Sequence, residues 1–213
     1  KWCKLRPVSL TTLNLSRTLP NARMAHIRIG PLNCRGLKSP AKRGRLGQYF
    51  KHHRVDILLL QETHITENSM MLDIEREWGV RCYWSLGGLN SRGVAIAFRP
   101  TLNLTHRCHY QDTEGRLVIA DVMIGDVSFR IVNIYAPNEV RERYNFFKTV
   151  QTHFHAPGKR VLIAGDFNCV EIADLDRISP ANRIISGSGD IKQLTEWKRT
   201  YALEDVFRHL YPQ

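Results

Sequence analysis

Short, nearly continuous apolar runs that each end in polar residues constrain the fold of this 213-residue chain more than any other feature. The run at residues 55–60, VDILLL, is too short for a typical helix, so it predicts a strand buried on both faces. Further strands are expected at residues 27–33, 80–86, 93–98, 102–109, 117–124, 127–135 and 161–164. Gly125 and Asp126 predict a tight hairpin turn between two of these strands.

Apolar residues at helical spacing predict helices between the strands. One helical face spans residues 46–53, a long amphipathic helix runs from Val140 to Phe154, and a last helix covers residues 190–200. Many short strands, several of them in hairpins, with a few interspersed helices favour an α/β fold. We expect a layered sandwich of mixed β-sheets flanked by helices rather than a Rossmann fold.

The composition predicts one soluble domain. With 213 residues, 43% of them hydrophobic, the chain can form one substantial core. Residues 1–23 lack a sustained period and contain Pro7 and Pro20, so we expect a basic, disordered extension before a domain at residues 24–213. Five widely scattered cysteines indicate a reducing compartment, and no apolar stretch approaches the roughly 18 residues of a membrane helix. The chain is therefore expected to be intracellular and to have no membrane partner.

The positive charge is concentrated near the N-terminus. The net charge is +11, and residues 1–55 contain 13 Lys and Arg but no acidic residue. The remaining residues hold 18 basic and 20 acidic side chains and are nearly neutral. A local excess of positive charge favours a polyanionic partner that contacts this part of the chain.

Polar side chains that could line one cleft follow four of the apolar strands. These side chains are Asn33, Gln61 with Glu62, Tyr135 with Asn138, and Asp166 with Asn168. The carboxyl ends of strands are where α/β sheets place ligands, and carboxylate and amide oxygens suit Mg²⁺ or Mn²⁺. Such a set meets the needs of phosphodiester hydrolysis: carboxylates for a metal and a water, and hydroxyl or amide donors for the developing charge.

At these residues the chain resembles the endonuclease/exonuclease/phosphatase superfamily. The matching motifs are LNCRGL at 32–37, DILLLQETHI at 56–65, VNIYAPN at 132–138 and LIAGDFNCV at 162–170. The combination of QETH, IYAPN and GDFN is most similar to the endonuclease domains of LINE-type retrotransposons. The resemblance implies a DNase-like four-layer sandwich, a nuclear enzyme that nicks DNA, and a reverse transcriptase on the same polyprotein.

The resemblance also implies roles for individual residues. Glu62 would bind the metal with help from Asn33, while Asp166 would orient or deprotonate the attacking water. Tyr135 and Asn168 would contact the scissile phosphate. Substrate contacts are expected from Asn138 and from the basic residues beside the first motif, namely Arg35, Lys42 and Arg43.

One expected element of the family does not occur in these 213 residues. Family members carry a further Ser-Asp-His motif after the GDFN strand, and no such tripeptide follows Asp166 here. The chain is therefore expected to lack the last strands of the domain and to be inactive by itself. Two alternatives stay open: a phosphatase or phospholipid diesterase of the same superfamily, and a non-enzymatic remnant of a retroelement.

Overall fold

The computed structural model describes residues 11–14, 26–100, 104–154, 156–170, 189–206 and 209. The chain divides into two compact units, residues 1–135 with 156–166 and residues 136–155 with 167–213. The first unit contains the helices α1 (Pro40–His52) and α2 (Asn68–Trp78) and the strands β1 (Thr11–Asn14), β2 (His26–Asn33), β3 (Ile57–Gln61), β4 (Arg81–Ser85), β5 (Val94–Phe98), β6 (Thr105–Gln111), β7 (Leu117–Ile124), β8 (Val127–Tyr135) and β9 (Arg160–Asp166). The second unit contains the helices α3 (Val140–Phe154) and α5 (Gly189–Tyr201).

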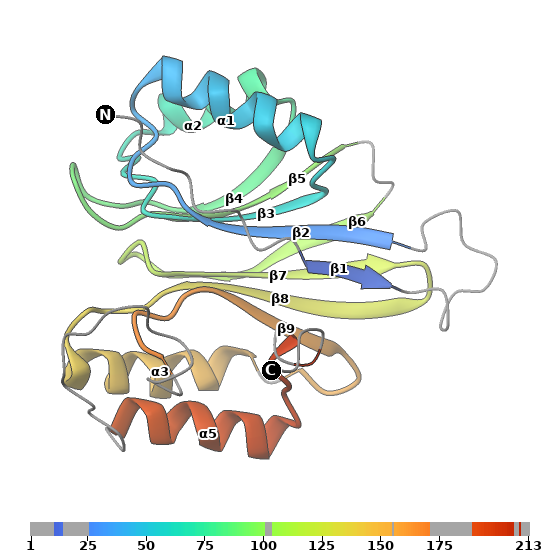
Figure 1. The fold of residues 1–213 in the computed structure, drawn as a ribbon, viewed down its shortest axis with the longest axis vertical. Helices are drawn as coiled ribbons and strands as arrows, with labels where there is room; N and C mark the ends of the chain where they lie inside the picture. Colours follow the sequence, from blue (N-terminus) through green and yellow to red (C-terminus); the bar gives the residue numbers. More distant parts are fainter. Residues whose placement is uncertain are drawn as a thin grey trace. The chain divides into compact units, whose positions relative to one another are not determined.

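The strands of the first unit form two mixed sheets, as the sequence predicted. One sheet has the order β1-β2-β3-β5-β4 and the other the order β6-β7-β8-β9. Strands β2 and β3 are parallel, as are β8 and β9, and the other pairs are antiparallel. Figure 1 shows α1 and α2 on the outer face of the first sheet.

Strand β3 is buried on both faces, which confirms the prediction from its apolar run. Ile57 and Leu59 belong to the core cluster between the two sheets, where they join Val118 and Ile131 of the second sheet. Leu58 and its neighbours on the other face of β3 belong to a second cluster, which α1 and α2 cover. Successive side chains of a strand point to opposite faces, so one short segment supplies both cores.

The predicted hairpin between β7 and β8 is also present. The two strands pair antiparallel from Leu117↔Ile134 to Ile124↔Val127, and Gly125 in the turn has φ 57°. Glycine adopts this left-handed conformation without the steric cost of a Cβ atom. The turn therefore fixes the register that brings the end of β8 back to the start of β7.

The second unit is held together by an aromatic contact and a buried ion pair. The rings of Phe147 on α3 and Trp197 on α5 have centroids 5.1 Å apart in an edge-to-face arrangement. The Arg143 guanidinium donates to Asp190 at 2.6 Å, and both side chains are buried. Each predicted helix of this unit is confirmed to within one residue at either end.

The structure departs from the sequence prediction at four places. Helix α1 begins at Pro40, six residues before the predicted helical face at residues 46–53, because proline is well tolerated in the first turn of a helix. Helix α2 was not predicted, because its buried face is short: only Ile74 and Trp78 are fully buried, and Leu72 is 59% exposed. Strand β6 begins at Thr105, and residues 101–103 lie outside the described residues. The segment Thr11–Asn14 pairs antiparallel with β2 as β1, so the expectation of a disordered extension fails for these four residues; the rest of residues 1–23 lies outside the described residues.

A buried amide network joins the two sheets beneath the ends of β3 and β8. Asn133 of β8 donates from Nδ2 to the carbonyl oxygens of Leu60 and Ala95 in the opposite sheet, at 3.0 and 2.9 Å. Its Oδ1 accepts from Nε2 of Gln61 at 2.6 Å. Asn133 is fully buried and Gln61 is 1% exposed, so these bonds have no competition from water.

Replacing Asn133 with Leu should destabilise the fold. The substitution leaves two carbonyl oxygens and the Gln61 amide buried without their partner, so the free energy of unfolding should fall by about 3 kcal/mol. Urea denaturation followed by circular dichroism measures the change. Gln48→Ala, at an exposed amide on α1, is the control and should stay within about 0.5 kcal/mol of the wild type. Equal stability of N133L and wild type would contradict the structural role of the network.

Candidate active site

Four of the residues predicted for the site meet at one edge of the first unit. Asn33 and Tyr135 are the last residues of β2 and β8, Asp166 is the last residue of β9, and Glu62 directly follows β3. The parallel pairs hold these positions in register, with Asn33 opposite Gln61 and Tyr135 opposite Asp166. The strand-end pattern of the sequence therefore corresponds to one place in space.

The Asn33 amide joins the two carboxylates of this site. Its Nδ2 donates to Oε1 of Glu62 at 2.9 Å and to Oδ2 of Asp166 at 2.9 Å. Its Oδ1 accepts the backbone N–H of Arg35 at 3.1 Å, which fixes the orientation of the amide. One neutral side chain therefore holds two negatively charged groups from different sheets within reach of each other.

The segment after β3 adopts a backbone conformation that few residues prefer. Glu62 has φ 51° and His64 has φ 55°, both in the left-handed region, where a residue other than glycine costs about 1–3 kcal/mol. Hydrogen bonds from Thr63 N to Gly93 O at 3.0 Å and from His64 N to Arg92 O at 3.1 Å hold the segment. At Gly93, which has φ 89°, an added Cβ would lie 2.3 Å from Oγ1 of Thr63, so the contact requires glycine.

Tyr135 lies against the two carboxylates as a hydrogen-bond donor. Its hydroxyl donates to Oε1 of Glu62 at 3.0 Å. Burial, the hydrogen bond to Glu62 and the negative charges of Glu62 and Asp166 together raise the pKa of Tyr135 to about 12. The phenol is therefore neutral near pH 7 and keeps its proton to donate.

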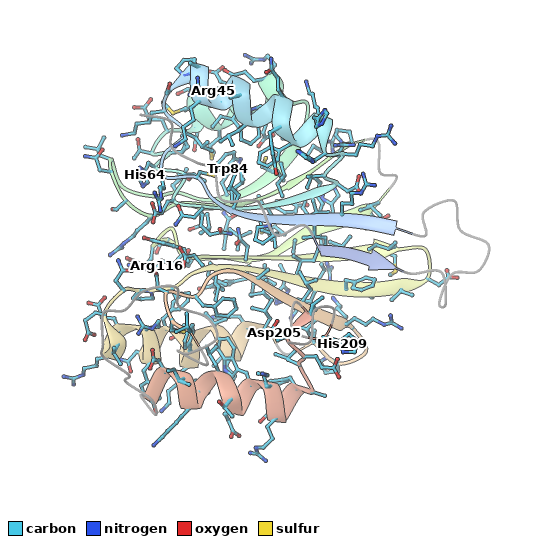
Figure 2. All side chains as sticks on the ribbon, viewed as in Figure 1. Arg45, His64, Trp84, Arg116, Asp205 and His209 are labelled. Atoms are coloured by element: carbon cyan, nitrogen blue, oxygen red, sulfur yellow. The ribbon has the colours of Figure 1, made fainter. Side chains whose placement is uncertain are left out.

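Arg116 is a site residue that the sequence analysis missed. Its Nη1 donates to the backbone oxygen of Tyr135 at 3.1 Å, and its guanidinium lies 5.3 Å from the centroid of the Tyr135 ring. The only local signal in the sequence was the turn DTEG at residues 112–115, just before Arg116. A turn does not predict where the side chain of the next residue points. Figure 2 shows Arg116 at the same end of the two sheets as His64.

His64 lies beside the Glu62 carboxylate. Its Nε2 is 3.9 Å from Oε2 of Glu62. Burial lowers the pKa of His64, and Lys38 and Lys42 lower it further, while the Glu62 carboxylate opposes the shift. The sequence analysis gave His64 no role, and the structure makes it a neighbour of the Glu62 carboxylate.

The predicted basic residues separate into exposed and buried groups. Arg35 is exposed, and Lys42 is half-buried with its ammonium bonded to the backbone oxygens of Cys34 and Arg35. Arg43 is only 7% exposed, and its guanidinium pairs with Glu77 at 2.8 Å and donates to the carbonyl oxygens of Leu37 and Lys38. The donors of Arg43 are thus engaged in the α1–α2 packing, and the predicted contact of Arg43 with substrate stays a prediction.

Asn138 and Asn168 belong to the second unit, and both make hydrogen bonds within that unit. The Asn138 carbonyl oxygen accepts from Nη1 of Arg143 at 2.7 Å. Asn168 has φ 48° and donates from Nδ2 to the carbonyl oxygen of Ala136 at 2.7 Å. The roles of both residues in the site stay predictions.

The donor set at the site fits a hard divalent cation. Glu62 and Asp166 supply carboxylates held by one amide, which matches the one or two carboxylates, completed by water, with which proteins usually bind Mg²⁺. No group of three or more His, Cys, Asp or Glu side chains suited to a metal occurs among the described residues. Such a site leaves most coordination positions to water and substrate oxygens.

The chain is thus an α/β protein with two mixed sheets and carboxylates at the strand ends, and comparison with known proteins identifies its family. The model of the Endonuclease/Exonuclease/phosphatase family matches residues 21–204, so the chain belongs to that family. A curated relative, the "Transposon TX1 uncharacterized 149 kDa protein" of Xenopus laevis, is 26% identical over 187 residues. The match covers 87% of this chain but only 14% of the length of that protein.

Solved structures share the fold. The AP endonuclease LMAP from Leishmania major superimposes with a TM-score of 0.68 at 20% identity, over 85% of this chain and 68% of that one. An AP endonuclease from Archaeoglobus fulgidus gives 0.67 at 18% identity, over 88% and 75%. The endonuclease domain of TRAS1, a telomere-specific non-LTR retrotransposon, gives 0.56 at 17% identity, over 81% and 71%. The predicted DNase-like fold class and the predicted likeness to retrotransposon endonucleases are both confirmed.

Replacing Glu62 with Gln should lower the pKa of Tyr135. The substitution removes the negative charge beside the phenol, so the pKa should fall from about 12 towards the ordinary value. The tyrosinate absorbance measures it, as the difference between each protein and the same protein carrying Tyr135→Phe. Glu67→Gln, at an exposed acid, is the control.

The raised pKa also gives a pH dependence of stability. The folded chain keeps the phenol protonated after the unfolded chain ionises, so the contribution is full below pH ~10 and is lost as the pH rises towards the folded value of about 12. A Tyr135 pKa that is the same in wild type and E62Q would contradict the hydrogen bond to Glu62.

Proposed function

We propose that this chain carries the metal-dependent active site of an endonuclease that cleaves phosphodiester bonds of DNA. The convergence of Glu62 and Asp166 on the amide of Asn33, beside the protonated Tyr135, is the observation that supports this function most. Two carboxylates with an adjacent neutral donor suit a phosphate ester, whose negative oxygens need both a cation and hydrogen bonds.

Mg²⁺ or Mn²⁺ would be held by Glu62, with Asn33 beside it, and would neutralise charge on the phosphoryl oxygens when bound. Asn33 acts here through its amide nitrogen, which sets the positions of both carboxylates. Its contribution to metal binding is therefore mainly that of a positioning residue.

Three side chains would then act directly on the substrate. The Asp166 carboxylate would orient the attacking water and accept its proton. The neutral phenol of Tyr135 would donate to a phosphoryl oxygen, in place of its present bond to Glu62. Asn168 is proposed to donate its amide to the same phosphate. Strand pairing holds Tyr135 opposite Asp166 at the ends of β8 and β9, which reduces the reorganisation that the reaction requires.

DNA is the proposed substrate because of the charge beside the site and the relatives of the chain. Arg35, in the exposed loop after Asn33, and Lys42 at the start of α1 place positive charge next to the carboxylate pair. Cations in such a position contact backbone phosphates without reading the base sequence. The likeness to transposon TX1 and to the TRAS1 endonuclease supports target-DNA nicking in the nucleus, with a reverse transcriptase as polyprotein partner.

Substitution of either carboxylate should weaken metal binding. Glu62→Gln and Asp166→Asn each remove one negative oxygen donor, so the affinity for Mn²⁺ should fall by roughly tenfold or more. Electron paramagnetic resonance of free Mn²⁺ measures the affinity on the 213-residue chain. Glu67→Gln, which removes an exposed carboxylate outside the site, should bind Mn²⁺ like the wild type. Unchanged affinity in both site variants would refute the metal site.

The 213 residues by themselves should nick DNA poorly. They contain no Ser-Asp-His tripeptide, and a missing general acid or stabilising histidine typically costs ~10² to 10⁴ in rate. Relaxation of supercoiled plasmid with Mg²⁺ measures nicking, with the TRAS1 endonuclease domain assayed in parallel. Any residual nicking should disappear in E62Q and D166N. A rate equal to that of the TRAS1 domain would overturn the proposed inactivity, and residual nicking retained by both variants would overturn the assigned site.

A further inference from the structure

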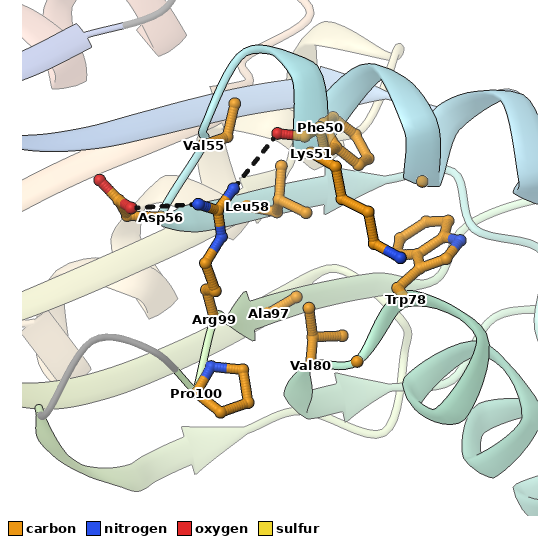
Figure 3. Close-up of a pocket in the computed structure, with 12 residues that line it drawn as sticks. Phe50, Lys51, Val55, Asp56, Leu58, Trp78, Val80, Ala97, Arg99 and Pro100 are labelled. Atoms are coloured by element: carbon orange, nitrogen blue, oxygen red, sulfur yellow. Dashed lines mark hydrogen bonds and ion pairs between the residues drawn. The ribbon is translucent and has the colours of Figure 1, made fainter.

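A cavity of about 490 Å³ lies beside the start of β3 and the end of β5. It is at the opposite end of β3 from Glu62. Apolar side chains form most of its wall: Phe50 comes from α1, Trp78 from α2, Leu58 from β3 and Ala97 from β5. Figure 3 shows these side chains together with the charged residues at the opening. The volume lies within the range of ligand pockets, and the four apolar side chains, which belong to the core beneath α1 and α2, contribute only their outermost atoms to the wall.

Positive charge gathers around the opening of this cavity. Lys51 and Arg99 line it, together with the carboxylate of Asp56. The Arg99 guanidinium is fixed by a 3.9 Å ion pair with Asp56 and by a 3.3 Å hydrogen bond to the carbonyl oxygen of Phe50 (Figure 3). A single carboxylate therefore faces two cations that line the cavity.

Two further cationic residues, Arg28 and Arg54, make backbone contacts with the residues around this opening. Arg28 donates its backbone N–H to Asp56 and its guanidinium to the carbonyl oxygen of His53. Arg54 lies in the turn between α1 and β3, where its N–H bonds to the carbonyl oxygen of Lys51. The side chains of Lys51 and Arg54 are exposed and make no hydrogen bond or ion pair with any residue that the structure describes. Their charges are thus available to a partner.

We propose that this edge binds single-stranded nucleic acid, with one base in the cavity and its flanking phosphates on Lys51, Arg54 and Arg99. An apolar cavity beside a cationic surface suits such a strand, because each nucleotide joins a planar base to a negative phosphate. A small amphipathic anion would occupy only the cavity. It would not contact the exposed cations outside the opening, whereas a strand would bring a phosphate to them. The proposal rests on the proposed function only in taking nucleic acid as the partner of the chain.

The site is separate from the catalytic carboxylates. Asp56 precedes β3 and Glu62 follows it, so the length of that strand, about 17 Å at 3.3 Å per residue, lies between them. A strand bound at the far edge would leave the active site open to a duplex. The chain could then hold a single-stranded segment while it acts on a double-stranded one.

Binding of a fluorescein-labelled oligothymidylate to the 213-residue chain, followed by anisotropy in EDTA, tests the proposal. The double variant Lys51→Glu with Arg54→Glu should weaken binding by roughly tenfold or more and reduce the slope of log K against log salt by about 1.4, since each single-strand phosphate contact contributes about 0.7. Val80→Phe, which narrows the cavity at a partly buried wall residue, should weaken binding without changing that slope.

The matched control is Arg76→Glu with Lys148→Glu, which changes the net charge equally at two exposed cations that do not line the cavity. It should bind the oligonucleotide far better than the first double variant, and Glu67→Gln, at an exposed acid outside both sites, should bind it like the wild type. Equal weakening by the two double variants would overturn the proposal. A second result would also overturn it: the Lys51→Glu and Arg54→Glu variant binds the oligonucleotide like the wild type, while Val80→Phe abolishes the fluorescence of bound anilinonaphthalene sulfonate. That result would assign the cavity to a small amphipathic anion. Either result leaves the Mn²⁺ and nicking predictions intact, since those depend on Glu62 and Asp166.

Discussion

The contact on which the candidate site depends is the buried amide of Asn133 between two strands of the opposite sheet. It bonds to the carbonyl oxygens of Leu60 and Ala95 and to the side chain of Gln61, and so fixes how β8 lies across β3 and β5. Apolar packing alone tolerates small shifts of one sheet over another, whereas these bonds have direction. Tyr135, two residues further along β8, is thereby brought to Glu62, one residue beyond Gln61.

The carboxylates of Glu62 and Asp166 lie close together in the site, and hydrogen-bond donors around them reduce the free-energy cost of their repulsion. Asn33 donates to both carboxylates, Tyr135 donates to Glu62, and Arg116 places a guanidinium beside the phenol ring. In the free chain these hydrogen bonds offset the repulsion between the two carboxylates. The left-handed backbone at Glu62 and His64 is a further cost, which the fold compensates by hydrogen bonds to Arg92 and Gly93.

The basic residues before Asp56 form one group in the sequence but not in the folded chain. The basic stretch before Asp56 predicted one polyanion-binding surface, and the structure distributes its residues over several environments. Arg35 lies at the catalytic edge, Arg43 is buried against Glu77, and Lys51 lies beside a cavity at the opposite edge of the sheet. Helical periodicity separates Arg43 from its neighbours, and no count of charges contains that information.

The sequence by itself determined the described strands except β1, most of the described helices and the family, because apolar periodicity and strand-end motifs are local patterns. It also named Asn33, Tyr135 and Asp166, the last residues of their strands, and Glu62, which directly follows β3; strand pairing holds these positions in register. Only the tertiary structure decided which donors reach them: Arg116 on Tyr135, His64 near Glu62, and Arg43 withdrawn into an ion pair. Side-chain partners such as Asn33 and Asp166, which are 133 positions apart, depend on sheet packing, which no local pattern in the chain specifies.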